Sequence, residues 1–285
     1  MAGGLMLLSL ASAGCRSGGL SKPASEAPSA AQTVACAPGS DQARASAPGS
    51  DVLVELFPGV RADIATHVVE FDAKASPMLM DDPRAPLFFV ETLVCAPDTR
   101  EHESLMVTDI KASHLHAAML AAGFTPGSPG LFKFAGGRFE AVDAMGDRLD
   151  LVVLVPQKDQ TVRESDPRTW IVSIAGAPDP QVSARDSGQP AHFGANTQDA
   201  AHGWVFAGSR MRSVTDQAGI KTEGYDADGT GVIVGLCCFG SETIAWSRTF
   251  SPDASIDEPE WVADFTKTPP PGTVVRVRVK RAPGK

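Results

Sequence analysis

The chain has 285 residues, which is enough for one large domain or two small ones. Its 27 glycines and 22 prolines predict many turns and argue against a helical bundle. A formal net charge of −9 gives an acidic surface that repels phosphate backbones, which argues against nucleic acid as a partner.

The first 14 residues have the pattern of an export signal. A short apolar run from Leu5 to Ala13 is followed by Gly14 and Cys15. A cysteine directly after Ala-Gly resembles the lipobox of bacterial lipoproteins, in which the signal is cut before the cysteine and the thiol receives a diacylglyceryl group. Ser12 departs from the leucine that is usual there. We predict a lipoprotein-type signal peptide over 1–14 with lipid attachment at Cys15, and a plain secretory signal is the alternative.

Residues 15–50 consist mostly of Ser, Ala, Gly and Pro. They contain almost no large apolar side chain, so they cannot bury enough surface to offset the entropy of ordering. We predict a disordered tether that holds a folded domain near a membrane. Cys36, an isolated thiol inside it, is interpreted as incidental.

Residues 51–285 are predicted to form a single mostly-β domain. Segments rich in branched and aromatic residues, bounded by turn residues, predict strands. The predicted strands are 52–57, 66–72, 86–96, 147–155, 169–175, 202–210, 232–239, 243–246 and 273–280, with 104–107 as a possible extension. In the last of them Val275, Val277 and Val279 alternate with basic residues and are expected to face inward.

One helix is predicted at about 113–122. Ser113 is a good N-cap, the alanines that follow have high helix propensity, and Gly123 suits the position after the last turn. The expected fold is therefore mostly β (α+β), with antiparallel strands in one or two packed sheets and one short helix.

Several segments together resemble the YdjY-like family of exported bacterial proteins, over residues from about 51 to 282. They are Thr99–Leu105, Ser113–Ala118, Gly123 with Pro126-Gly127, Gly203–Arg210, Tyr225–Gly229 and Gly235–Ala245. The family has no established molecular function. The resemblance therefore implies export and a shared domain, and it leaves the chemistry open.

Four residues are candidate metal or ligand contacts: His102, Glu103, His114 and His116. Residues two apart on a helix point about 200° away from each other, so His114 and His116 cannot both face one ion there. Met106 stands where an HExxH motif would have its second histidine. The remaining hypothesis for a metal or ligand site is that His102, Glu103 and one helix histidine meet at the N-terminal end of the helix. The other interpretation is that these residues are structural.

The remaining motifs are weak. Neither Ser104 nor Ser209 lies in a GxSxG nucleophile motif. Cys237 and Cys238 are neighbours in an apolar strand and are read as buried free thiols, although either could pair with Cys95 in an oxidising compartment.

The acidic segment Tyr225–Gly231 lacks the distal glutamate of a calcium loop, so it is interpreted as a turn.

These observations predict an exported, lipid-anchored cell-envelope protein that acts as a binding or structural module on the extracytoplasmic side. Its expected partners are the membrane, through the lipid, and an envelope protein or ligand that the sequence does not identify. No cofactor and no catalytic residue are predicted. The alternatives are a metal-assisted envelope enzyme using His102, Glu103 and His116, and a thiol-based redox or assembly factor.

Overall fold

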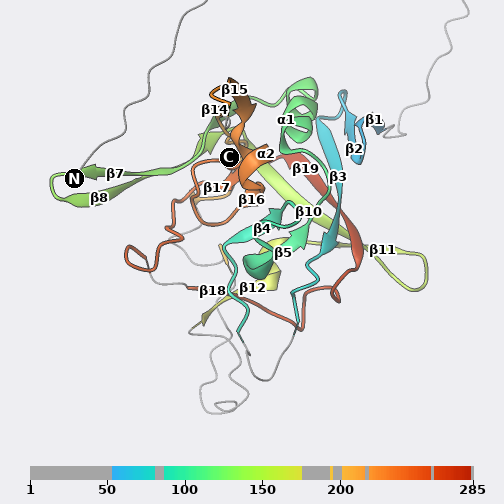
Figure 1. Cartoon of the computed structure of the whole chain (residues 1–285). Coiled ribbons are helices and arrows are strands. Elements are labelled where there is room, and N and C mark those ends of the chain that lie inside the picture. Colours follow the sequence, from blue (N-terminus) through green and yellow to red (C-terminus); the bar gives the residue numbers. More distant parts are fainter. Residues whose placement is uncertain are drawn as a thin grey trace, which may run out of the picture. The chain divides into compact units, whose positions relative to one another are not determined.

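A closed β-barrel lies at the centre of the computed structural model, which describes residues 53–80, 87–174, 193–194, 201–215, 218–257 and 260–283 (Figure 1). Eight strands pair in a ring, and the pairing of β3 with β5 closes it. In pairing order they are β3 (Val68–Ala75), β19 (Val274–Arg281), β10 (Arg148–Pro156), β13 (Trp204–Val205), β17 (Ile244–Trp246), β16 (Val232–Gly235), β4 (Thr92–Cys95) and β5 (Ser104–Val107).

The mostly-β prediction is confirmed, but the prediction of antiparallel strands in one or two packed sheets is wrong. The barrel is mixed, because β4 runs parallel to β5 and β16 runs parallel to β17. Its closure rests on the pairs Lys74↔Val107 and Ala75↔Met106. The apolar pattern marks a segment as a strand, but the direction of its neighbour depends on how the connecting loop returns. That direction is decided by tertiary contacts.

Further strands extend or decorate the barrel. β1 (Val54–Phe57) and β2 (Val60–Asp63) continue the sheet beyond β3, and β11 (Val162–Ser165) pairs with β10. Four two-stranded pairs lie outside the ring: β6 (Pro126–Ser128) with β9 (Met145–Gly146), β7 (Leu131–Ala135) with β8 (Arg138–Val142), β12 (Ile171–Ser173) with β18 (Trp261–Ala263), and β14 (Met211–Thr215) with β15 (Lys221–Tyr225).

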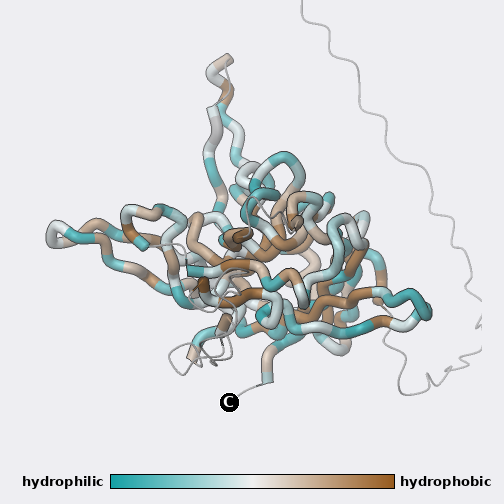
Figure 2. Tube along the Cα trace, turned by 90° about the horizontal axis from the view of Figure 1, so that it is seen from below, coloured by the Kyte–Doolittle hydropathy of each residue, from teal (hydrophilic) through white to brown (hydrophobic). Residues whose placement is uncertain are grey.

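The barrel interior is filled by alternate side chains of its long strands. Val275, Val277 and Val279 of β19 are buried, as predicted, and they pair with strands that place Val69 and Phe71 beside them. Hydrophobic segments run through the middle of this unit, and hydrophilic ones occupy several of the projecting turns (Figure 2). The chain divides into units Met1–Pro48 and Gly49–Lys285, and the described core belongs entirely to the second. That unit therefore contains the apolar side chains that its own folding requires.

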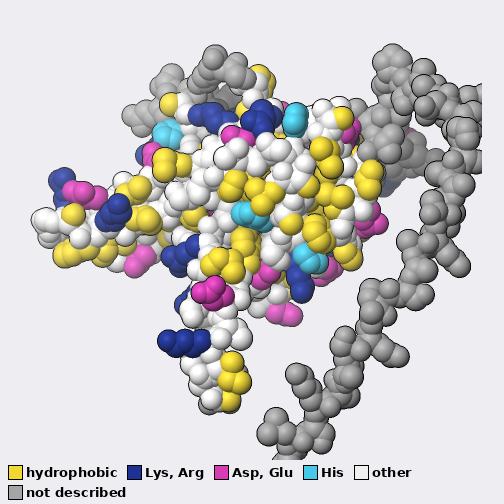
Figure 3. Space-filling model, turned by 90° about the horizontal axis from the view of Figure 1, so that it is seen from above, with side chains coloured by type: hydrophobic (Ala, Val, Ile, Leu, Met, Phe, Trp, Pro, Cys, Tyr) yellow, Lys and Arg dark blue, Asp and Glu magenta, His cyan; other side chains and the backbone are white. Residues whose placement is uncertain are grey.

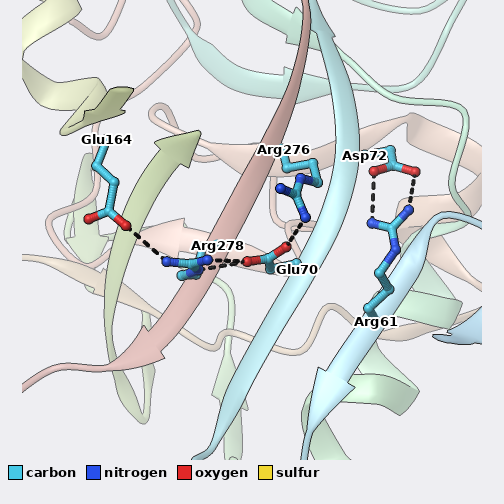
Figure 4. A network of polar contacts seen from close by, with 6 residues as sticks. All are labelled: Arg61, Glu70, Asp72, Glu164, Arg276 and Arg278. Carbon is cyan, nitrogen blue, oxygen red and sulfur yellow. Dashed lines mark hydrogen bonds and ion pairs between the residues drawn. The ribbon is translucent and has the colours of Figure 1, made fainter. Parts of the chain in front are cut away.

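An ion-pair network covers the outer face of β2, β3 and β19 (Figure 4). Glu70 is fully buried there and accepts from Arg276 at 2.8 Å and from Arg278 at 2.7 Å. Arg278 also reaches Glu164 of β11 at 2.9 Å. The neighbouring pair, Arg61 with Asp72, is held by two parallel hydrogen bonds of 2.8 and 2.7 Å. The network joins four strands through side chains, in addition to their backbone pairing.

The predicted helix is present as α1 (Ala112–Ala121), which packs against β2. Gly123 follows it with φ of +83°, and Phe124 N donates to Met119 O at 3.0 Å, as a Schellman ending requires. His67, which the sequence interpretation missed, contacts the Ala122 carbonyl oxygen through Nδ1 at 2.6 Å. At the C-terminal end of α1 the carbonyl groups of Met119 and Ala122 therefore have partners.

The prediction of Ser113 as the N-cap is wrong. The cap position is Lys111, whose side chain forms no capping bond. Asp228 supplies the missing acceptor, because it takes hydrogen bonds from Ser113 N at 2.9 Å and Ser113 Oγ at 2.6 Å. A residue distant in sequence therefore caps α1, which no local pattern could indicate.

The number of helices also differs from the prediction. Asp228 lies in α2 (Asp226–Thr230), a short helix in the segment that was interpreted as a turn. Single turns of 3₁₀-helix are formed by η1 (Glu101–Glu103) and η2 (Pro167–Trp170). Within the described ranges, no helix is long and apolar enough to cross a membrane.

Candidate functional site

Two unusually short crossover loops meet at one end of the barrel. Segment 96–103 joins the parallel strands β4 and β5, and segment 236–243 joins the parallel strands β16 and β17. Crossovers between parallel strands commonly need a dozen or more residues, so eight leave little room for regular structure. Thr92 pairs with both Gly235 and Ser104, which brings the end of one loop and the start of the other together.

The residue that ties the two loops together is Glu91, which directly precedes β4. Its backbone N–H donates to Glu103 O at 3.0 Å. Its carbonyl oxygen accepts from Leu236 N at 3.0 Å and from Cys237 N at 2.8 Å. One residue thus bonds to the end of the first loop and to the beginning of the second.

Each loop is held internally by a glutamate. Glu101 accepts from Asp98 N at 2.5 Å and Thr99 N at 3.0 Å. Glu242 accepts from Phe239 N and from Gly240 N, the latter at 3.0 Å. These carboxyl groups replace the backbone partners that the tight loops lack. Burial raises the pKa of Glu242.

Two carboxyl groups face each other where the loops meet. Glu91 and Glu103 hydrogen-bond through their side chains, and Arg100 pairs with Glu103 at 2.5 Å. Burial raises the pKa of Glu91 to about 7, the charge of Glu103 adds to this, and Arg100 opposes it. Arg100 also lies over the Phe239 ring at 3.9 Å, so it connects the two loops. Glu91 is therefore partly protonated near neutral pH.

This carboxyl pair should make stability fall as the pH rises. In the unfolded chain Glu91 ionises near its ordinary pKa, whereas in the folded protein its pKa is about 7. Between these values the folded state holds one more proton than the unfolded state, so the free energy of unfolding decreases as pH rises. Because Glu91 is only half-buried, we expect a decrease on the order of 1–2 kcal/mol from about pH 5 to about pH 8.

Urea denaturation of Glu91→Gln and the parent protein at both pH values measures this effect. Glutamine keeps the shape but does not ionise, so its unfolding free energy should vary less over the interval. Glu140→Gln, which removes an exposed carboxyl from β8, is the matched control and should behave like the parent. Equal pH dependence in all three proteins would show that the pair does not control stability.

A cavity of about 210 Å³ opens beside Glu91. Its wall combines carboxyl groups, one guanidinium group and aromatic rings. The residues that line it are Phe89, Val90, Glu91, Cys237, Arg248, Phe250, Ser251, Pro252, Asp257, Glu260 and Trp261. The Arg248 guanidinium lies 4.8 Å from the centre of the Phe250 ring, and Asp257 accepts from Ser251 N at 2.8 Å. Such a mixture of apolar walls with a few convergent polar groups is typical of a small-molecule site.

The three cysteines predicted as disulfide candidates are free thiols. Cys95 is buried in β4, Cys237 lines the cavity, and Cys238 is partly exposed. Burial raises the pKa of all three thiols, so little thiolate is present at neutral pH. Cys15, the predicted lipid attachment site, lies outside the described residues, as does Cys36.

The four metal or ligand candidates do not form one group. His102 and Glu103 lie at the crossover loops, where the His102 ring is 3.5 Å from the Glu103 carboxyl group. His114 stacks on Phe57, with ring centres 4.4 Å apart. His116 contacts Tyr225 OH at 2.9 Å, and burial lowers its pKa. The described part of the chain contains no group of three His, Cys, Asp or Glu residues arranged to hold a metal.

A second set of contacts joins the other segments that carry the family resemblance. Tyr225 OH lies 3.2 Å from Thr243 Oγ1, so His116 connects through it to the second crossover loop. Ser209, with φ of +52°, donates its backbone N–H to Glu242 O at 2.8 Å. The resemblance segments therefore converge in space, although they are up to about 140 residues apart in sequence.

A family model described as the YdjY domain matches residues 60–280. The chain belongs to the YdjY family. The match spans the barrel from β2 to β19 and includes both crossover loops. No curated protein and no solved structure matches the chain.

The sequence named Glu103 as a metal or ligand candidate and Cys237 as a possible disulfide partner, but it did not name Glu91 or Arg100 as site residues. In the YdjY domain Glu91 is the one acid within the apolar run Pro86 to Ala96. A charged residue inside a strand that is expected to be buried is a signal of function or of a specific partner. For Arg100 there was no such signal, because its partner Phe239 lies in the other loop.

Proposed function

We propose that this YdjY protein is an envelope binding module whose cavity at the crossover loops takes a small organic ammonium group. The observation that carries the proposal is the convergence of Glu91, Asp257 and Glu260 with aromatic walls around one cavity. The cavity wall carries three carboxyl groups and one guanidinium group, and this excess of acidic groups favours a cationic ligand. Aromatic faces attract ammonium groups through their quadrupoles, and the cavity volume limits the ligand to a small group.

The proposal predicts a pH dependence for ligand binding. Glu91 ionises with a pKa of about 7, so its negative charge is present above this value and largely absent below it. A cation in the cavity should therefore bind more tightly at about pH 8 than at about pH 6. We expect about a tenfold change, the size of one charge-assisted contact.

Titration of the unit 49–285 with tetramethylammonium chloride, followed by calorimetry or by NMR shifts of the tryptophan indoles, tests this. Glu91→Gln should bind weakly at both pH values, and the Glu140→Gln control should retain the pH dependence. Sodium acetate, an anion of similar size, should not bind. If tetramethylammonium binds the parent and Glu91→Gln equally at high pH, the cavity is not the ammonium site.

The same proposal places the domain at a membrane through a lipid on Cys15. The support is the apolar segment that ends in Ala-Gly-Cys and the tether-like composition that follows it. Mass spectrometry of the mature protein should find a diacylglyceryl group on an N-terminal Cys15. Cys15→Ser should abolish this modification, whereas Cys36→Ser, the matched control, should keep it. An intact chain that begins at Met1 with an unmodified Cys15 would contradict the anchor.

A further inference from the structure

The hairpin formed by β7 and β8 projects away from the barrel at the left of Figure 1, and it is the projection at the left of the Cα trace in Figure 2. Its turn is Gly136-Gly137, and a Cβ atom built on either glycine meets nothing within 4 Å. The tip therefore stands clear of the rest of the described chain. Hairpins of this length are marginally stable alone, so a projecting one that carries apolar side chains calls for a partner.

The two faces of this hairpin differ in chemistry. The register pairs Phe134 with Phe139 and Phe132 with Ala141, so these four side chains share one face. Phe134 is 69% exposed and Phe139 54% exposed, and their rings meet edge to face at 5.3 Å.

The opposite face carries the charged residues together with smaller apolar ones: Leu131, Lys133, Ala135, Arg138, Glu140 and Val142. Lys133 pairs in register with Glu140 there, and Arg138 bonds to Glu140 at 3.1 Å. The face therefore carries two cations against one acid. Aromatic rings backed by basic side chains are the composition of membrane-interface elements, in which the rings enter the headgroup region and the cations remain at its surface. Figure 3 shows hydrophobic side chains along this projection, with basic and acidic groups near its end.

We propose that the β7–β8 hairpin inserts its phenylalanine face into the interface of the bilayer to which Cys15 is attached. This inference rests on the proposed anchor. The chain from Cys15 to Leu53, the first described residue, can span at most roughly 130 Å, so the proposed anchor keeps the hairpin within reach of the bilayer. The apolar face is a projecting ridge and not a groove, which suits a deformable lipid interface better than a flat protein surface. The hairpin would orient the domain that the lipid alone leaves free to rotate.

Binding of the unlipidated unit 49–285 to vesicles of phosphatidylethanolamine and phosphatidylglycerol tests the inference without the anchor. Phe134→Ser should weaken partitioning by about tenfold, because the loss of one buried phenylalanine is of this size. Ile64→Ser, which removes another exposed apolar side chain (57%) from the turn between β2 and β3, should have no effect. Phe134→Trp should show blue-shifted emission on vesicles, since the four native tryptophans are already buried.

The Phe134→Trp variant keeps the hairpin intact, so its result does not depend on whether Phe134→Ser folds. An unshifted tryptophan spectrum, or equal partitioning of Phe134→Ser and Ile64→Ser, would overturn the inference. So would a parent that fails to bind vesicles but forms dimers that Phe134→Ser dissociates, because the occupant would then be a second copy. Absence of the lipid on Cys15 would instead refute the anchor. The vesicle measurement uses the unlipidated unit, so it distinguishes a failure of the anchor from a failure of hairpin insertion.

Discussion

Replacing Glu70 by alanine should lower the free energy of unfolding by about 3 kcal/mol. Glu70 is fully buried on β3, between β2 and β19, and accepts hydrogen bonds from Arg276 and Arg278. Without it two guanidinium groups lie side by side with no shared anion between them. Because both arginines are partly exposed, water recovers part of the loss, which keeps the effect below the upper end for buried pairs.

Thermal and urea denaturation of the unit 49–285 measure this loss, which should appear as a decrease in Tm of about 10 °C. Glu164→Ala is the matched control, because it removes an exposed carboxyl from the same Arg278. Exposed ion pairs contribute about 0–1 kcal/mol, so the control should change little. If both variants lose the same stability, burial of Glu70 is not what makes the network important.

Replacing Gly146 by alanine should destabilise the protein by about 3 kcal/mol, for a reason that lies in the backbone. Gly146 has φ of +143°, a region that side chains rarely adopt. A Cβ atom there would overlap the Phe206 carbonyl oxygen and crowd Gly127 N at 3.0 Å. The chain would have to separate β9 from the segment after β13, where Phe206 N donates to Asp147 O at 2.9 Å.

Gly137→Ala is the matched control for this prediction. Gly137 also has positive φ, at +83°, but nothing lies within 4 Å of a Cβ built on it. It should lose only about 1 kcal/mol, the cost of the backbone conformation itself. Urea denaturation compares the two variants. Similar losses would mean that the contact with Phe206 relaxes without penalty.

The contact between the Glu91 and Glu103 carboxyl groups connects the fold to the proposed function. The pair exists because two short crossovers bring loops from different parts of the chain to the same end of the barrel. The raised pKa of Glu91 then gives the adjacent cavity a charge that changes near neutral pH. Two independent measurements examine Glu91. The urea denaturation needs no ligand, and the tetramethylammonium titration compares the same variants in the folded state.

Strands and the helix were predictable from sequence where the pattern of neighbouring residues indicated them. The alternating valines of β19 predicted which of its side chains face inward. Gly123 predicted the end of α1 to within one residue. The strand at Ser104–Val107 was also indicated by its own side chains. The β7–β8 hairpin was not predicted, although its phenylalanines alternate with charged residues around a Gly-Gly turn, and its apolar face is not buried against the core.

Sequence alone determined the mostly-β character, the family and the presence of α1, because propensity, alternation and motif order act over neighbouring residues. Tertiary structure alone decided that the barrel closes through β3 and β5, that two strand pairs are parallel, and that Asp228 caps α1. Those outcomes depend on contacts between residues far apart in the chain, which no short pattern encodes. For the same reason the partner of Glu103 is Glu91 and not a histidine of α1.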